Sequence, residues 1–172
     1  MKKLLFAFCV ACGYQPLYAT PAAEAYHVHL AKNLGSSAVV AEEVLRGARE
    51  TLAKEGALAS GDGYPRLEIE VLRADETSEG IVAAQSPSGL EPRARASDLA
   101  VVARAYVTRR AGSSAELDTG DLRAEALVGA PLGDSTREVW QREDSMRAVA
   151  RRLGGRIVMR VLGHPVVTAP VE

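Results

Sequence analysis

The five residues Leu67-Glu68-Ile69-Glu70-Val71 alternate strictly between apolar and acidic side chains. In an extended strand this alternation sends every apolar side chain to one face and both carboxylates to the other. A strand with one apolar and one solvated face favours an antiparallel sheet that is covered on one side only. The rest of the chain must therefore supply partner strands and a layer that covers the apolar face.

Three other segments have the same period of two residues and predict three more strands. They run from Tyr26 to Leu30, from Leu99 to Arg109 and from Leu122 to Val128. The last two are expected to form a hairpin, because only the turn-rich residues 111–120 separate them.

Proline and glycine predict where the sheet is interrupted. The strand at 67–71 is expected to resume at 81–84, after a polar stretch. Residues 86–92 contain two prolines and a glycine, which oppose regular pairing, so a loop is expected there.

Two segments have apolar residues at helical spacing. The first runs from about Ser37 to Glu55, with a serine that can cap its start and Gly56 at its end. The second runs from Ser135, which can form a capping box with Glu138, to about Leu162. The glycine pair 154–155 in its interior is interpreted as a close approach to the sheet.

These elements predict an α/β fold. Its architecture is a two-layer sandwich in which two helices pack on one face of a mainly antiparallel four-stranded sheet. The elements occupy residues 25–165 and form one domain, and residues 166–172 are interpreted as a C-terminal tail.

The start of the chain has the pattern of an export signal. Lys2 and Lys3 precede a short apolar run that ends at Val10, and Ala11-Cys12 then has the form of a lipoprotein processing site. Residues 1–11 are interpreted as a lipoprotein signal peptide, Cys12 as the lipid attachment, and residues 12–24 as a linker. The alternatives are an ordinary cleavage site with a buried cysteine, or a start codon placed elsewhere.

Composition limits the classes of partner. Without residues 1–11, 161 of the 172 residues remain, which suits one domain. Two of the 21 basic residues leave with the signal, so 19 basic face 22 acidic residues, a net charge of −3. Nucleic acid is therefore not an expected partner. No later segment is apolar for the roughly 18 residues of a membrane span, so covalent lipid is the expected attachment.

Catalytic and metal-binding motifs do not stand out. The sequence contains no Gly-x-Ser-x-Gly elbow, no His-Glu-x-x-His and no phosphate-binding loop, so neither an enzyme nor a cofactor is expected. His27 and His29 share one side of the first predicted strand, with His164 as the remaining histidine. An exposed strand face explains the pair better than a metal site.

Arginine is the more suggestive residue type, because residues 12–172 contain 17 arginines and two lysines. Arginine makes bidentate contacts with carboxylates and phosphates, so an arginine surface could meet lipid headgroups or an acidic partner. The simpler interpretation is a solvated face. Spacings of four residues on the second helix relate Arg147 to Arg151, and Arg152 to Arg156 and Arg160. The ligand-binding candidates are Arg93, Arg95, Arg109, Arg110, Arg147 and Arg151.

The opening Cys12-Gly13-Tyr14-Gln15-Pro16-Leu17-Tyr18, together with the order of strands and helices, resembles the lipopolysaccharide-assembly lipoproteins of the LptE family. The resemblance implies a lipid-anchored, periplasm-facing protein of the outer membrane. Such a protein partners and plugs a β-barrel translocon of the LptD type and binds lipopolysaccharide. Gly13 is compatible with sorting to the outer membrane. An alternative of another class is a periplasm-facing adaptor or regulator of a cell-wall enzyme.

Overall fold

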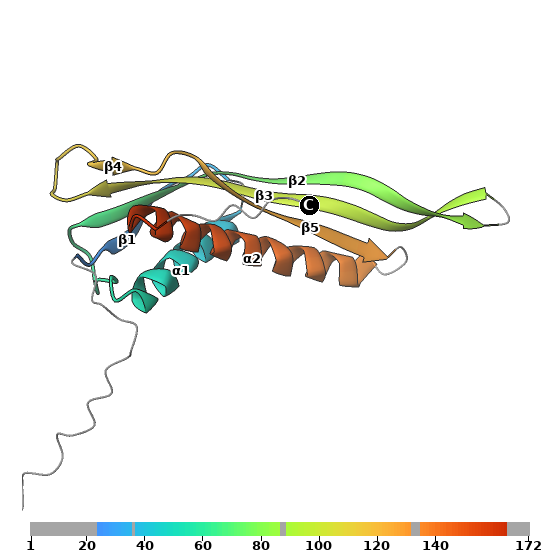
Figure 1. Cartoon of the computed structure of the whole chain (residues 1–172), viewed down its shortest axis with the longest axis horizontal. Coiled ribbons are helices and arrows are strands. Elements are labelled where there is room, and N and C mark those ends of the chain that lie inside the picture. Colours follow the sequence, from blue (N-terminus) through green and yellow to red (C-terminus); the bar gives the residue numbers. More distant parts are fainter. Residues whose placement is uncertain (1–23, 36, 87–88, 132–134, 165–172) are drawn as a thin grey trace, which may run out of the picture.

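The computed structural model describes residues 24–35, 37–86, 89–131 and 135–164. In this part of the chain, five strands form one sheet and two helices cover one of its faces (Figure 1). The sheet order is β1, β2, β3, and both β4 and β5 pair with the other side of β3. The elements are β1 (His27–Asn33), α1 (Ala38–Lys54), β2 (Arg66–Ser86), β3 (Gly89–Thr108), β4 (Leu117–Asp118), β5 (Leu122–Pro131) and α2 (Ser135–Val161).

The predicted two-layer sandwich is confirmed, with two corrections to its sheet. The sheet has five strands instead of four, because the short β4 pairs with β3 before β5 does. In addition, β1 and β2 run parallel, while the other three pairings are antiparallel. Parallel neighbours need a crossover connection, which α1 provides.

The predicted loop at 86–92 is wrong for its second half, because β3 already begins at Gly89. Pro92 pairs with Ala83, while Ala94 pairs with Val82, so Arg93 is an extra residue at a β-bulge. A bulge is one of the places where a sheet tolerates proline. β2 is also continuous over 21 residues, about 65–70 Å. The β2–β3 ribbon consequently extends well past both helices (Figure 1).

The core lies between the sheet and the helices. Leu67, Ile69 and Val71 are all fully buried, as their alternation with glutamate predicts. Burying a side chain of this size contributes about 1.5–3 kcal/mol relative to leaving it exposed. The largest buried residues that pack in this layer also include Val44, Leu52, Val101, Val149, Leu153, Ile157 and Val158.

Two glycines bring the helices into backbone contact. A Cβ atom on Gly47 would lie 2.0 Å from the carbonyl oxygen of Arg151, and one on Gly154 would lie 2.0 Å from that of Val44. The close approach expected at Gly154 therefore exists, but its partner is α1 and not the sheet. Gly155 is different, since its Cβ would meet only the hydroxyl of Thr51, at 3.0 Å.

We expect Gly154→Ala to destabilise the fold by about 1–3 kcal/mol, because the helices cannot separate without opening the core. Gly155→Ala is the matched control one residue away. Its neighbour is a rotatable side chain, and alanine favours a helix by about 1 kcal/mol over glycine, so its effect should stay below about 1 kcal/mol. Urea unfolding of both variants measures the difference, and equal losses would contradict the backbone contact.

Candidate functional site

The six candidate arginines do not form one site. Arg93 and Arg95 belong to the first part of β3, and their side chains lie outside the described part of the structure, as does Cys12. Arg109 and Arg110 follow the other end of β3, roughly 45 Å along the strand from them. Arg147 and Arg151 are on α2, in the other layer.

Arg151 joins the two helices through a buried carboxylate. Its Nε and Nη2 atoms both donate to one oxygen of Glu43 on α1, at 3.0 and 2.8 Å. Glu43 is only 6% exposed, and Arg46 pairs with its other oxygen at 3.3 Å. The hydrogen bond to Glu43 raises the pKa of Arg151. Arg151 therefore neutralises a buried charge at the helix contact, which occupies its donors.

Arg147 and Arg151 do line a common surface groove. This groove lies between α1 and α2 and has a volume of about 520 Å³. Arg147 is held by its own helix, through Asp144 at 3.2 Å and Glu143 at 3.5 Å. Among the described side chains of the groove, Lys54 and Arg152 have no such carboxylate partner. The two predicted arginines of the groove, Arg147 and Arg151, are thus already paired with carboxylates of the chain itself.

Arg109 is the centre of a second ion network, at the end of β3. It pairs with Glu24 and, through Nε at 2.7 Å, with Glu116. The charge of Glu24 is the main reason that the pKa of Arg109 is raised. Glu24 also accepts from the hydroxyl of Tyr26 at 2.9 Å. This network fixes the start of the described chain to the sheet. Arg110 is exposed, and its carbonyl accepts from Ser113 in a turn.

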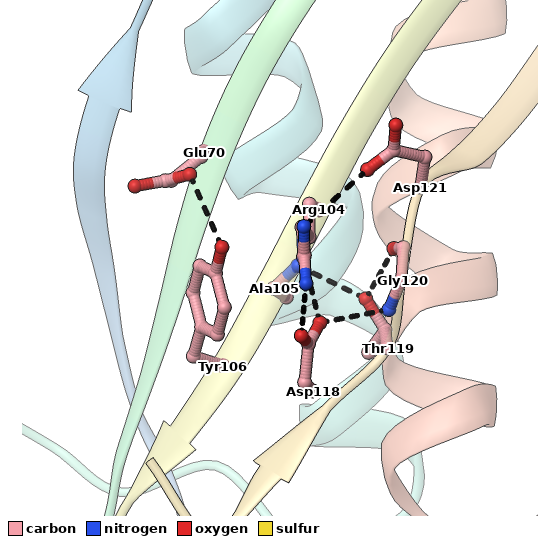
Figure 2. Close-up of polar contacts among 8 residues, drawn as sticks. All are labelled: Glu70, Arg104, Ala105, Tyr106, Asp118, Thr119, Gly120 and Asp121. Atoms are coloured by element: carbon pink, nitrogen blue, oxygen red, sulfur yellow. Dashed lines mark hydrogen bonds and ion pairs between the residues drawn. The ribbon is translucent and has the colours of Figure 1, made fainter. Parts of the chain in front are cut away.

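The densest polar cluster contains none of the predicted site residues. It lies where β4 gives way to β5, on the sheet face away from the helices (Figure 2). Arg104 donates from Nε to Asp118 at 2.8 Å, adds a second contact through Nη2, and lies 4.0 Å from Asp121. Asp118 also accepts from the N–H of Gly120, whose φ is 68°. We call Arg104, Asp118, Thr119, Gly120 and Asp121 the strand-break cluster.

Thr119 provides the hydrogen bonds that β3 would otherwise lack between the end of β4 and the start of β5. Its hydroxyl accepts from the N–H of Ala105 at 3.0 Å and donates to the carbonyl of Gly120 at 2.9 Å (Figure 2). Its own N–H donates to the carbonyl of Ala105 at 3.0 Å. Both backbone groups of Ala105 are therefore satisfied although β4 has ended, which avoids the cost of unpaired buried polar groups.

The electrostatics of the cluster follow from these contacts. The hydrogen bonds from Arg104 and then from Gly120 lower the pKa of Asp118 from 3.8 to about 2. Arg104 also lies 5.2 Å from the ring centroid of Tyr106, a cation–π contact. Desolvation, followed by the charge of Glu70, raises the pKa of Tyr106. Within the cluster, Arg104 faces both Asp118 and Asp121, so its geometry suits a structural junction better than a catalytic one.

The structure also shows the surroundings of His27 and His29, and it bears on the predictions about metal binding and membrane spans. His27 donates from Nδ1 to the carbonyl of Gly61 at 3.1 Å, and His29 is exposed on the same strand. In the described part of the chain, no group of three His, Cys, Asp or Glu side chains is arranged to hold a metal ion. Within the same residues, neither helix is both long and apolar enough to cross a membrane.

A signal for the strand-break cluster exists in the sequence. Asp118-Thr119-Gly120-Asp121 combines turn-forming residues with a threonine in the middle of an otherwise alternating region. Most of this run falls within the predicted tip of a hairpin. Its partner Arg104 could not be identified, because an outward arginine on a strand does not reveal which acid it faces.

Comparison with known proteins shows what this fold is similar to. No family model matches the chain, and no curated protein matches its sequence. Among solved structures, a minor lipoprotein from Acinetobacter baumannii matches with a TM-score of 0.54 at 13% identity, over 83% of this chain and 94% of that one. Rare lipoprotein B from Shewanella oneidensis matches with a TM-score of 0.46 at 12% identity, over 77% and 94%. The fold is thus one that occurs among bacterial lipoproteins.

We expect Asp118→Asn to lower the melting temperature at neutral pH and to have less effect in acid. The folded pKa lies below the unfolded one, so the contribution of the carboxylate is complete above about pH 5 and is lost as pH falls from about 4 to 2. Thermal unfolding from pH 7 to 2 should show the gap to wild type closing over that range. Asp144→Asn, at a side chain 72% exposed, is the control; a gap independent of pH would contradict the assignment.

We expect Arg151→Gln to lower the melting temperature more than Arg147→Gln, one turn away on the same helix. The first change leaves the buried Glu43 with one cation, whereas the second releases only exposed carboxylates. The pair of variants is compared by thermal unfolding at neutral pH. Equal shifts would show that Arg151 belongs to the solvated face after all.

Proposed function

We propose that this chain is an outer-membrane lipoprotein, anchored through Cys12 and facing the periplasm, that partners and plugs a β-barrel translocon and assists lipopolysaccharide assembly. The observation that carries the proposal is the processing pattern Ala11-Cys12 ahead of a domain whose fold occurs among bacterial lipoproteins. The LptE-like opening at residues 12–18 supports the finer assignment to lipopolysaccharide assembly.

The geometry of the domain is compatible with a chain that is anchored at Cys12 and contacts a partner in the same membrane. Glu24 is fixed to the end of β3 by Arg109, and it lies 12 positions after Cys12 in the sequence. At about 3.6 Å per extended residue, Glu24 stays within roughly 40–45 Å of the lipidated sulfur. The same end of the sheet holds the start of β2, whereas the β2–β3 ribbon points the other way (Figure 1). A contact through the ribbon would therefore be made at the opposite end of the sheet from Glu24 (Figure 1).

A role without catalysis fits the described charges. The acidic groups of the strand-break cluster are paired with Arg104, and the groove between the helices contains Arg147 and Arg151 in ion pairs. Lipopolysaccharide carries phosphate groups, which arginine binds well. Among the predicted arginines whose side chains the structure describes, Arg110 is the one that forms no ion pair with another described residue. It is therefore the best remaining candidate for such a contact.

We expect the membrane-fraction protein to carry a diacylglyceryl mass at residue 12 and to co-purify with a β-barrel protein after solubilisation. Intact mass spectrometry measures the first outcome, and barrel recovery with the tagged chain measures the second. Cys12→Ala is the control for both. It should lack the lipid mass, and the protein should leave the membrane fraction.

The outcomes separate the alternatives. An unmodified, freely soluble chain would contradict the anchor. A lipidated chain that recovers no barrel would contradict the translocon role and favour the adaptor of a cell-wall enzyme. Depletion of the chain then distinguishes these two roles, because the first disturbs surface lipopolysaccharide and the second disturbs wall synthesis.

A further inference from the structure

β5 is an edge strand whose outer side has a known register. The backbone groups of Ala105 point to Thr119, on the side of β3 where β5 also lies. Alternation along β3 therefore presents the backbone groups of Ala103, Val101, Leu99 and Ser97 to β5. Their partners on β5 are the even-numbered residues from Leu122 to Val128. The N–H and C=O groups of the odd-numbered residues 123–129 therefore point away from the sheet, toward the open edge.

Helix α2 satisfies only one carbonyl at each end of this open edge. Arg156 donates to the carbonyl of Arg123 at 3.0 Å, and Gln141 donates to that of Gly129 at 3.5 Å. These contacts confirm that the odd-numbered carbonyls face outward. Between them, Glu125 and Leu127 have no hydrogen-bond partner for these groups among the described residues. Leu127 is in addition 69% exposed, on the face away from the helices.

Positive charge lies beside this edge. Arg156 reaches β5, and residues four positions apart share a helix face, so Arg160 lies on the same side of α2. Arg152, one turn earlier, instead lines the groove between α1 and α2. In the described part of the chain, neither Arg156 nor Arg160 belongs to an ion pair, in contrast to Arg147 and Arg151. We call Arg156 and Arg160 the arginine row.

We propose that the open edge of β5 and the arginine row of α2 together bind an extended acidic segment of a partner protein, which adds to the sheet as a further strand. Unpaired N–H and C=O groups in register fit another extended backbone. Side chains of an added strand alternate between the two faces, so those on the helix side would lie beside the arginine row. Carboxylates at these positions complement its charge, and an apolar side chain on the other face would cover Leu127.

A second copy of the chain fits this edge less well. Pairing of two β5 strands about a twofold axis would place both copies of α2 on the same face of the joined sheet. Both arginine rows would then lie on that face, and like charges across a contact oppose association. The charge of the row therefore selects an acidic partner over the protein itself.

The probe is a short synthetic peptide in which Glu and Val alternate, and its counterpart is a peptide in which Lys replaces Glu. We expect the full chain to bind the Glu peptide in fluorescence anisotropy, less tightly as salt rises, and to bind the Lys peptide at least about tenfold more weakly. In amide hydrogen exchange followed by NMR, the Glu peptide should slow the outward N–H groups of residues 123, 125, 127 and 129, which have no partner among the described residues of the free chain.

Two pairs of variants locate the contact. Glu125→Pro removes an outward N–H without breaking the ladder to β3, so it should weaken binding about tenfold relative to Glu125→Gln, which keeps that N–H. Arg156→Gln should also weaken binding, whereas Arg49→Gln on α1 makes the same charge change elsewhere and should not.

Several results would overturn the proposal. These are no binding of the Glu peptide, equal binding by the two Glu125 variants, or protection of amides other than those of β5. A wild-type dimer that Glu125→Pro converts to a monomer in analytical ultracentrifugation would assign the edge to a second copy instead. Should Glu125→Pro fail to fold, Arg156→Gln and the exchange pattern decide the question.

Discussion

The contact of α1 with α2 at Gly47 and Gly154 is the constraint on which the rest of the domain depends. Because neither residue has a side chain, the two backbones approach closely enough for both helices to lie over one sheet face. The same approach places Glu43 under Arg151, where a buried carboxylate needs its cation. The packing of the core, the spacing of the two helices and the ion pair of Glu43 with Arg151 therefore all depend on this contact.

Sequence patterns predict the layers of the fold better than its connections. Strict alternation at 67–71 and helical spacing in two segments report directly which side chains are buried, and the structure confirms both. The parallel pairing of β1 with β2 follows from the helix between them, so the predicted order of strand, helix and strand already contained this signal although the antiparallel prediction did not use it. The loop prediction fails at Pro92 because the compatibility of this proline with a strand depends on a bulge opposite β2.

The arginine content is evident from the sequence, but the roles of individual arginines are not predictable from it. Arg104, Arg109 and Arg151 compensate carboxylates that come from distant parts of the chain. Sequence spacing shows that residues four positions apart share a helix face, as in the arginine row. It does not show which arginines of a helix form ion pairs with carboxylates and which remain unpaired. That distinction separates structural arginines from those available to a partner, and only the tertiary arrangement provides it.

The fixed position of Glu24 at one end of an elongated sheet has a consequence for encounter rates. With a lipid at Cys12, the domain explores only a shallow layer next to the bilayer, so its search for a membrane-embedded partner becomes nearly two-dimensional. Confinement of both partners to such a layer raises the concentration that each one meets. A weak contact at the surface of the domain would then be occupied more often, without any gain in intrinsic affinity.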